Sequence, residues 1–300
     1  MDLKKLAFSL TLSASLFAGC GDDSGGTTST TSTTTTSTTT TSTTNTSTTN
    51  TLTDFGMCGD AGEPSLYRMN VLHIPTPSEA SAGDTVGHNV DGTGDICGVP
   101  DYAGGVDNSL IDLAAGLPAL APDDPVDLQA EIDAGLACAA GSTDCSRIDL
   151  IVSVRTGTGC VIVEVEDGEG ETLAGPFTGS LDSNGNMRGN VSALALTIPY
   201  STADGPVDIN LSVTNVIITG TLTSDGLEDV VIGGALVQSD FETTIMNLLP
   251  LLGGDITFED IGPTLENLYD VQSGGNCAAL SVGLTASGVP YTPPAVAVAN

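Results

Sequence analysis

The chain has 300 residues, of which 38 are aspartate or glutamate and only six are lysine or arginine, so its net charge is −32 at pH 7. Proteins that bind nucleic acid or anionic lipid headgroups need clustered Lys and Arg, and this composition argues against both kinds of partner. Tryptophan is absent and the other aromatic residues are few. The core must therefore be built from aliphatic side chains.

The first 19 residues are organised like a bacterial export signal. Lys4 and Lys5 precede an apolar run over residues 6–17, which is too short to span a bilayer as a helix. The letters LFAGC at 16–20 then resemble the lipobox of bacterial lipoproteins. In that family the cysteine becomes the first residue of the mature chain and carries the lipid, which implies a signal peptide over 1–19 and lipidation of Cys20. The alternative is an ordinary secretory signal with a chance cysteine.

Residue two of the mature chain would be Gly21. The resemblance to lipoproteins implies that an aspartate there favours retention in the inner membrane. Glycine therefore favours the outer membrane, with the chain facing the periplasm or the cell surface. No other run approaches the ~20 apolar residues of a transmembrane helix, so we expect the lipid to be the only membrane contact. Cleavage removes Lys4, Lys5 and Asp2, a net loss of one positive charge, and leaves the mature chain at −33.

A tether is expected next, over residues 20–53. From residue 24 onwards this segment is nearly all Thr and Ser, without an apolar period, so it has no face to bury and should stay disordered. A coil of about 30 residues spans ~30 Å on average, enough to hold a folded domain away from a membrane. Its hydroxyl groups also permit O-glycosylation, although a plain spacer is the simpler interpretation.

Residues 54–108 are rich in Gly, Asp and Pro, and we expect them to be irregular. Oxygen-bearing side chains with interspersed glycines are what a calcium loop needs. The candidate ligands are Asn89, Asp91, Asp95, Asp101 and Asp107. The loop is not an EF-hand, because Pro100 occupies the position of its bidentate glutamate. Calcium is the one cofactor that we expect, and the alternative is a loop held by Asx turns and by Cys97.

A second, weaker calcium candidate is the sequence DSNGN at 182–186, which a plain hairpin turn explains as well.

Two helices are predicted after this loop. Residues 110–120 are apolar at helical spacing and end near Pro118. The second helix opens with Asp124 as N-cap and Pro125 at its first position. Its buried stripe repeats every four residues at Leu128, Ile132 and Leu136.

The period then changes to two, which predicts strands. Residues 148–154 and 161–165 form a hairpin around the turn 156–159, and further strands cover 194–198 and 207–213. The inward-facing parity switches between Asn215 and Val216, which predicts a β-bulge. Helical spacing returns over 235–249, and a short helix starts near Thr257. A closing strand follows over 280–284, and a Pro-rich tail covers 288–300.

The order of these elements predicts an α+β fold, in which helices flank an antiparallel sheet or β-sandwich. The body of the fold is expected over residues 109–287.

Six cysteines remain after Cys20, and an even number in an exported chain predicts three disulfides. They are Cys58, Cys97, Cys138, Cys145, Cys160 and Cys277. Six cysteines allow 15 connectivities, among which we favour Cys58–Cys97, Cys138–Cys145 and Cys160–Cys277. A zinc site is the alternative, but the chain has no Cys-x-x-Cys pair and only His73 and His88 could assist.

Three stretches together resemble a known group of proteins. They are VDGTGDICGVPDYAGGVDN at 90–108, IDAGLACAA at 132–140 and CAALSVGL at 277–284. They are similar to uncharacterised lipoproteins and secreted proteins of myxobacteria and related bacteria. The resemblance implies an Asp/Gly-rich N-terminal loop, a helix, a β-rich body and a terminal strand, and it carries no activity or catalytic residue.

The sequence predicts a lipid-anchored module with a binding or structural role, stabilised by calcium, whose protein or glycan partner is unknown. One alternative is a periplasmic carrier that holds a small ligand or lipid in an apolar pocket between sheet and helices. The other is a hydrolase, but the chain has no G-x-S-x-G motif and no Trp on which a sugar could stack. We therefore expect no enzymatic activity and no catalytic residues.

Overall fold

The computed structural model describes residues 57–92, 94, 97–120, 125–140, 142, 145–202, 205–251 and 257–293. The chain divides into two units, Met1–Thr46 and Ser47–Asn300, and every described residue belongs to the second. The predicted signal peptide, Cys20 and the predicted tether therefore lie outside the described residues.

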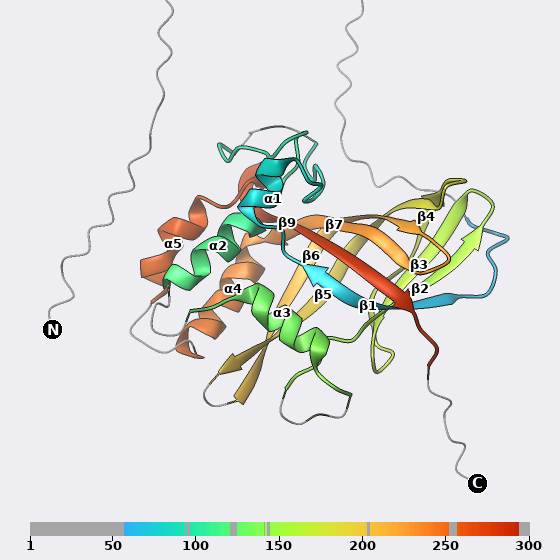
Figure 1. Ribbon diagram of the computed structural model, residues 1–300. Coiled ribbons are helices and arrows are strands. Elements are labelled where there is room, and N and C mark those ends of the chain that lie inside the picture. The colour runs from blue at the N-terminus through green and yellow to red at the C-terminus, as the bar shows by residue number, and fades with distance from the viewer. Residues whose placement is uncertain are drawn as a thin grey trace, which may run out of the picture. The chain divides into compact units, whose positions relative to one another are not determined.

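The described part is mainly one antiparallel sheet (Figure 1). Its strands are β1 (Ser65–His73), β2 (Leu150–Gly157), β3 (Cys160–Asp167), β4 (Thr172–Leu181), β5 (Asn186–Thr202), β6 (Gly205–Leu222), β7 (Leu227–Val237), β8 (Val271–Ser273) and β9 (Asn276–Pro290). Strands β1 to β7 pair in sequence order, β7 pairs with β9, and β9 also pairs with β1. The sheet therefore closes on itself, so of the two predicted alternatives the antiparallel sheet is formed and the sandwich is not.

The inside of the closed sheet is packed with aliphatic side chains. In β3, for example, Val161, Val163 and Val165 are buried and alternate with partly exposed residues. A cavity of about 30 Å³ remains among the inward side chains of β1 to β3 and β5 to β7. This volume admits one or two water molecules at most.

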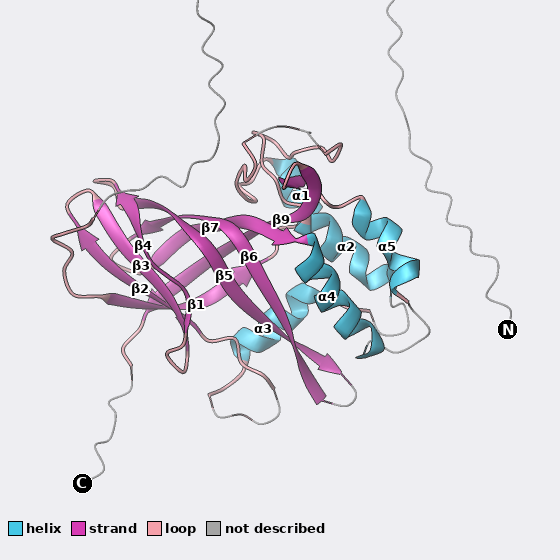
Figure 2. Ribbon diagram, turned by 180° about the vertical axis from the view of Figure 1, so that it is seen from behind, coloured by secondary structure: helices cyan, strands magenta, loops and turns pink. Residues whose placement is uncertain are grey.

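Helices gather at one end of the sheet (Figures 1 and 2). They are α1 (Pro77–Ala82), α2 (Leu110–Leu120), α3 (Leu128–Ala137), α4 (Gln238–Leu248), the 3₁₀ turn Leu249–Leu251 and α5 (Phe258–Glu266). Their apolar faces join the core of the sheet through buried residues such as Leu113, Ile132, Phe241 and Leu265. Within the described residues, none of the helices has the length and apolar character needed to cross a membrane.

Several predicted elements are confirmed. Helices form at residues 110–120, near 128–137 and after Thr257, and the hairpin of β2 and β3 turns at Thr158 and Gly159. The bulge is also present, because the register of β6 against β7 shifts between Thr214 and Ile217, where Asn215 has a φ of 52°. Antiparallel strands with flanking helices thus follow from local patterns.

Other boundaries were predicted wrongly. Residues 54–108 contain β1 and α1, and β9 runs to Pro290, into the predicted tail. Strands β4 and β7 were missed, and β7 includes residues 235–237 that were assigned to a helix. Helix α3 begins at Leu128 with Asp127 as its N-cap, whose carboxylate accepts from the backbone N–H of Ala130 at 3.1 Å. Asp124 lies outside the described residues.

Three disulfides form, as predicted, but only Cys138–Cys145 has the favoured pairing. The other two are Cys58–Cys160 and Cys97–Cys277. Before β1 the chain runs beside the β2–β3 turn, where the N–H of Gly62 donates to Thr156 O at 3.1 Å, and this brings Cys58 to Cys160. Cys58 and Cys97 lie in loops, so the tertiary placement of these loops against β3 and β9, rather than sequence proximity, decided both bonds.

Candidate functional site

The Asp-rich loop is held mainly by its own hydrogen bonds. Asn89 Oδ1 accepts from the N–H of Gly92 at 2.5 Å, and Asp107 Oδ2 accepts from the N–H groups of Val90 and Asp91 at 2.6 and 3.3 Å. The Asn89 bond is the local side-chain-to-backbone bond of an Asx-type turn, whereas the Asp107 bonds tie the loop to a residue 16 to 17 positions further along the chain.

Asp107 is buried, and its burial raises the pKa of the carboxyl to about 7. The negative charges of Asp91 and Asp101 act in the same direction, whereas the backbone hydrogen bonds oppose the shift. Asp95 lies outside the described residues. Within the described ranges no three His, Cys, Asp or Glu side chains are grouped to hold a metal ion, so a calcium site here stays a prediction.

A polar cluster seals one edge of β9. Strand β8 pairs with β9 up to Ala279 and β1 pairs with it from Thr285, so residues 280–284 have a strand neighbour only on the β7 side. The Asn108 amide fills this gap. Its nitrogen donates to Gly283 O at 3.1 Å and to Val86 O at 2.5 Å, and its oxygen accepts from the N–H of Gly283 at 2.9 Å. Asn108 therefore replaces a strand residue.

Asp270 and Ser109 complete this cluster around Ser281. The N–H of Ser281 donates to Asp270 Oδ1 at 2.7 Å and its hydroxyl donates to Asp270 Oδ2, while the N–H of Ser109 donates to Ser281 Oγ at 2.7 Å. All three residues are buried, and burial raises the pKa of Asp270. Asn108, Ser109, Asp270, Ser281 and Gly283, called the β9 seam below, have a structural task that the sequence patterns did not reveal.

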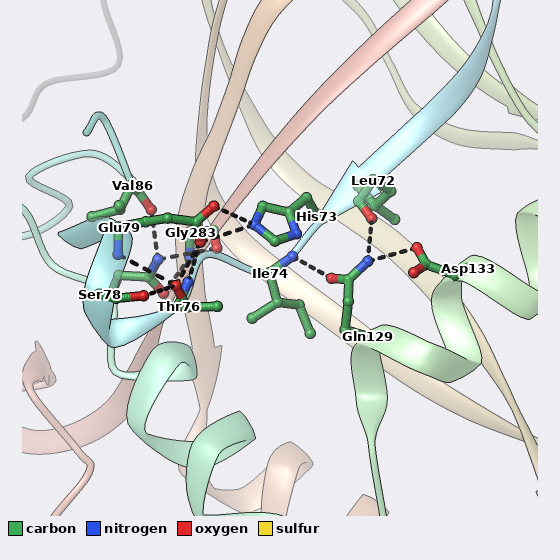
Figure 3. A network of polar contacts seen from close by, with 11 residues as sticks. Leu72, His73, Ile74, Thr76, Ser78, Glu79, Val86, Gln129, Asp133 and Gly283 are labelled. Carbon is green, nitrogen blue, oxygen red and sulfur yellow. Dashed lines mark hydrogen bonds and ion pairs between the residues drawn. The ribbon is translucent and has the colours of Figure 1, made fainter. Parts of the chain in front are cut away.

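His73 belongs to a second network, which ties β1 to α1 and α3 (Figure 3). Its Nε2 lies 3.0 and 3.1 Å from the carboxylate oxygens of Glu79. The backbone and side-chain hydrogen bonds of Thr76, followed by the contact with His73, lower the pKa of Glu79 to about 2. Gln129 of α3 accepts from the N–H of Ile74 at 2.7 Å and donates to Leu72 O at 3.2 Å.

His88 is mostly buried and packs on β7. Its Nε2 lies 3.2 Å from Val231 O and 3.3 Å from Thr219 Oγ1. A carbonyl oxygen only accepts, so Nε2 carries the proton, and His88 in this tautomer does not serve as a base for Thr219. Burial lowers the pKa of the imidazole, and the nearby Arg188 charge adds to the effect.

A groove of about 970 Å³ crosses the outward face of the sheet beside His88. Cross-strand pairing places one row of residues over it, from β4 through β5, β6, β7 and β9 to β1. The row is Ser180, Arg188, Thr219, Val231, Thr285 and His73, and all of these except His73 line the groove. With neighbouring strands about 4.8 Å apart, these six positions extend over ~24 Å.

The side chains of the groove are mostly short and polar. Thr221, Asn186, Ser287 and Thr85 lie beside the row, and Arg188 is exposed. In the described part of the chain, the ion pairs involve Arg68, Arg147 and His73 but not Arg188. Arg188 therefore remains available to a ligand.

Two carboxylates also line the groove. Asp182 accepts from the N–H groups of Asn184 and Asn186 at 2.8 and 2.9 Å and from the amide of Asn186, and these bonds lower its pKa. This is the hairpin turn that the sequence DSNGN allowed, and its oxygens are already engaged. Asp229 lies at a bulge of β7 with a φ of 49°, a left-handed conformation that is uncommon for residues other than glycine.

A second hollow, of about 660 Å³, lies near the Cys138–Cys145 bond. It contains Arg147, whose guanidinium already lies 3.4 Å from Asp149 Oδ2. Its other charged residues are acidic: Asp167, Glu169 and Asp208. The groove with Arg188 is therefore the better candidate for binding.

The sequence did not single out the groove, because polar residues at outward positions occur in any sheet with a solvated face. Comparisons with models of protein families, with curated proteins and with solved structures found no match.

Proposed function

We propose that this protein is a lipid-anchored binding module of the outer membrane, stabilised by calcium, which presents the groove to a ligand in the periplasm or at the cell surface. The observation that carries the binding role is the groove itself, with its short polar side chains and Arg188. Three disulfides support export to an oxidising compartment. The LFAGC sequence at 16–20 supports the anchor.

Cavity size favours this role over that of an apolar carrier. One apolar cavity lies inside the sheet and another lies between the sheet and helices α2 and α3, and each measures about 30 Å³. Pockets that enclose small ligands are usually ~300 Å³ or larger. The groove has that size, but it is open and half polar.

The chemistry of the groove favours binding over hydrolysis. His88 has its Nε2 proton directed at a carbonyl oxygen, and His73 pairs with Glu79. The Asp182 carboxylate has a lowered pKa, whereas a general acid needs a raised one. The exposed guanidinium of Arg188 and the hydroxyls of Thr285 and Ser287, which line the groove, suit hydrogen bonding to a bound molecule.

The anchor is tested by Cys20→Ala in the full-length protein, expressed in the source bacterium. The wild type should enter the detergent phase in a detergent-partitioning experiment. The variant should accumulate as unprocessed precursor or as a freely soluble product. A variant that still partitions with membranes would contradict lipidation at Cys20.

The binding role is tested with the mature protein in detergent, mixed with the detergent-insoluble polymers of the cell envelope and sedimented. Arg188→Glu should reduce co-sedimentation strongly. Arg155→Glu is the matched control, because Arg155 is also exposed, takes part in no ion pair among the described residues and does not line the groove. Equal sedimentation of all three proteins would exclude a role of the groove.

A further inference from the structure

We propose that the ligand of the groove is a neutral polysaccharide chain that lies across strands β5, β6, β7 and β9. This inference rests on the proposed binding function and adds the chemical class of the ligand.

The shape of the groove suits a chain rather than a compact molecule. The row from Ser180 to Thr285 crosses five strands, and the groove that these residues line has a volume of about 970 Å³. Hydrogen-bonding side chains recur along this row at Arg188, Thr219 and Thr285. Arg188 and Thr219 lie on neighbouring strands, and Thr219 and Thr285 lie two strands apart. A polymer with repeating polar groups can meet several of them at once.

The side chains match sugar hydroxyls in their hydrogen-bonding properties. A threonine or serine hydroxyl both donates and accepts, as a sugar hydroxyl does, and the Arg188 guanidinium offers several donors in a fixed plane. Thr219, Thr285 and Ser287 are only partly exposed, so a bound ligand would shield their hydrogen bonds from water. Asp229, which is exposed and lines the groove, adds a hydrogen-bond acceptor.

A peptide is a poorer fit, because extended peptides usually bind by adding a strand to a free sheet edge. The floor of the groove consists of central strands. Strand β6 pairs with β5 and β7, and β7 pairs with β6 and β9, so their backbone groups are already used.

Charge argues for a neutral polymer over an acidic one. The mature chain would carry a net charge of −33, and Asp182 and Asp229 line the groove beside the single arginine. A polyanion would be repelled both by the whole domain and by these carboxylates. An apolar ligand is disfavoured because Val71 is the one strongly exposed apolar side chain among the described lining residues.

The test is affinity electrophoresis of the mature protein in native gels that contain one polysaccharide each. The neutral probes are a soluble β-glucan, a dextran and a galactomannan, and the acidic probe is polygalacturonate. The wild type should be retarded by at least one neutral probe. Arg188→Ala and Thr285→Val should each weaken the apparent affinity by about tenfold, the effect expected for one or two lost hydrogen bonds.

Arg155→Ala serves as the control and should change the affinity less than about twofold, because it removes an exposed arginine outside the groove. Equal melting temperatures of all variants would show that they remain folded. Thr285→Val keeps the shape of the side chain, so it tests the hydroxyl alone.

The outcomes separate this inference from the proposed function. If no neutral probe retards the protein while sedimentation with envelope polymers still depends on Arg188, the ligand class is wrong and the binding role stands. Retardation by polygalacturonate alone would overturn the neutral ligand. Retardation that is identical in the wild type, Arg188→Ala and Thr285→Val would place saccharide binding outside the groove.

Discussion

At the residue scale, Asp107 and His88 make opposite contributions to stability as the pH changes. Asp107 is 3 % exposed, and its pKa is raised from 3.8 to about 7, so the folded protein holds a proton that the unfolded chain has lost. Its contribution to stability therefore decreases as the pH rises from about 4 to 7. The pKa of His88 is lowered, so its contribution decreases as the pH falls through the ordinary histidine range.

Asp107→Asn should remove the first of these dependences. The amide oxygen can still accept from the N–H groups of Val90 and Asp91, but it carries no charge. At pH 8 the free energy of unfolding of the variant should exceed that of the wild type by about 1–2 kcal/mol, so the variant should unfold at a higher urea concentration. This difference should vanish near pH 4. Urea titrations at pH 4, 6 and 8 in the presence of a chelator measure this difference.

Asp208→Asn, at an exposed position of β6, is the matched control and should leave the pH dependence unchanged. A parallel pH dependence of the wild type and Asp107→Asn would mean that Asp107 stays ionised in the folded protein.

At the element scale, the β9 seam replaces a missing strand. An unpaired strand edge in a buried position leaves backbone groups without partners, and each such group costs about 1–3 kcal/mol. The Asn108 amide satisfies the N–H and the carbonyl of Gly283 together with the carbonyl of Val86. The Asn108 side chain thus supplies hydrogen bonds to the edge of β9 between the segments where β8 and β1 pair with this strand.

Asn108→Ala should therefore destabilise the protein by about 3 kcal/mol or more, because it leaves these backbone groups buried and unsatisfied. Asn267→Ala is the control: its amide also donates to a carbonyl, Pro263 O at 2.7 Å, but it is exposed, and its loss should cost less than about 1 kcal/mol. Chemical denaturation measures both variants, and equal losses would show that the seam contributes no more than a surface contact.

At the scale of the whole molecule, disulfides link segments that are far apart in the sequence. Cys97–Cys277 joins cysteines 180 residues apart, whereas Cys138–Cys145 joins cysteines seven residues apart. The entropy that a cross-link removes from the unfolded chain grows with the length of the loop it closes.

Replacing Cys97 and Cys277 by serine should cost about 5 kcal/mol, and replacing Cys138 and Cys145 only about 2 kcal/mol, in the chain-entropy description. Denaturant unfolding of the two double variants measures the difference. Thiol titration of the denatured, unreduced protein should find none of these six cysteines free, and two or more reactive thiols would contradict the three bonds. A larger loss for the short loop would contradict the entropic explanation.

Charge also acts on the molecule as a whole. At a net charge of −33, folding brings many negative charges close together. Divalent cations at the Asp-rich loop would relieve the resulting repulsion. Millimolar calcium should raise the melting temperature more than sodium at equal ionic strength, and Asp91→Asn with Asp101→Asn should abolish the difference.

Asp225→Asn with Asp240→Asn removes the same charge from exposed sites outside the loop and should leave the calcium effect in place. Identical effects of calcium and sodium on the wild type would show that the loop is held by Asx turns and by Cys97 alone.

Local patterns in the sequence determined α2, the body of α3, α5, the β2–β3 hairpin and the bulge at Asn215. These elements depend on side-chain periodicity, caps and turns within a few residues, which act before any long-range contact forms. The number of disulfides likewise followed from an even cysteine count in an exported chain.

Tertiary structure alone decided the closure of the sheet, the pairing of four cysteines, the β9 seam and the groove. Strand β1 meets β9 across more than 200 residues, so neither strand carries a local sign of its partner. Register across the strands then places Arg188, Thr219 and Thr285 in one row, although each occupies an ordinary outward position in its own strand. A site assembled from single residues of several strands has no sequence motif, because its residues are neighbours across the strands and are far apart along the chain.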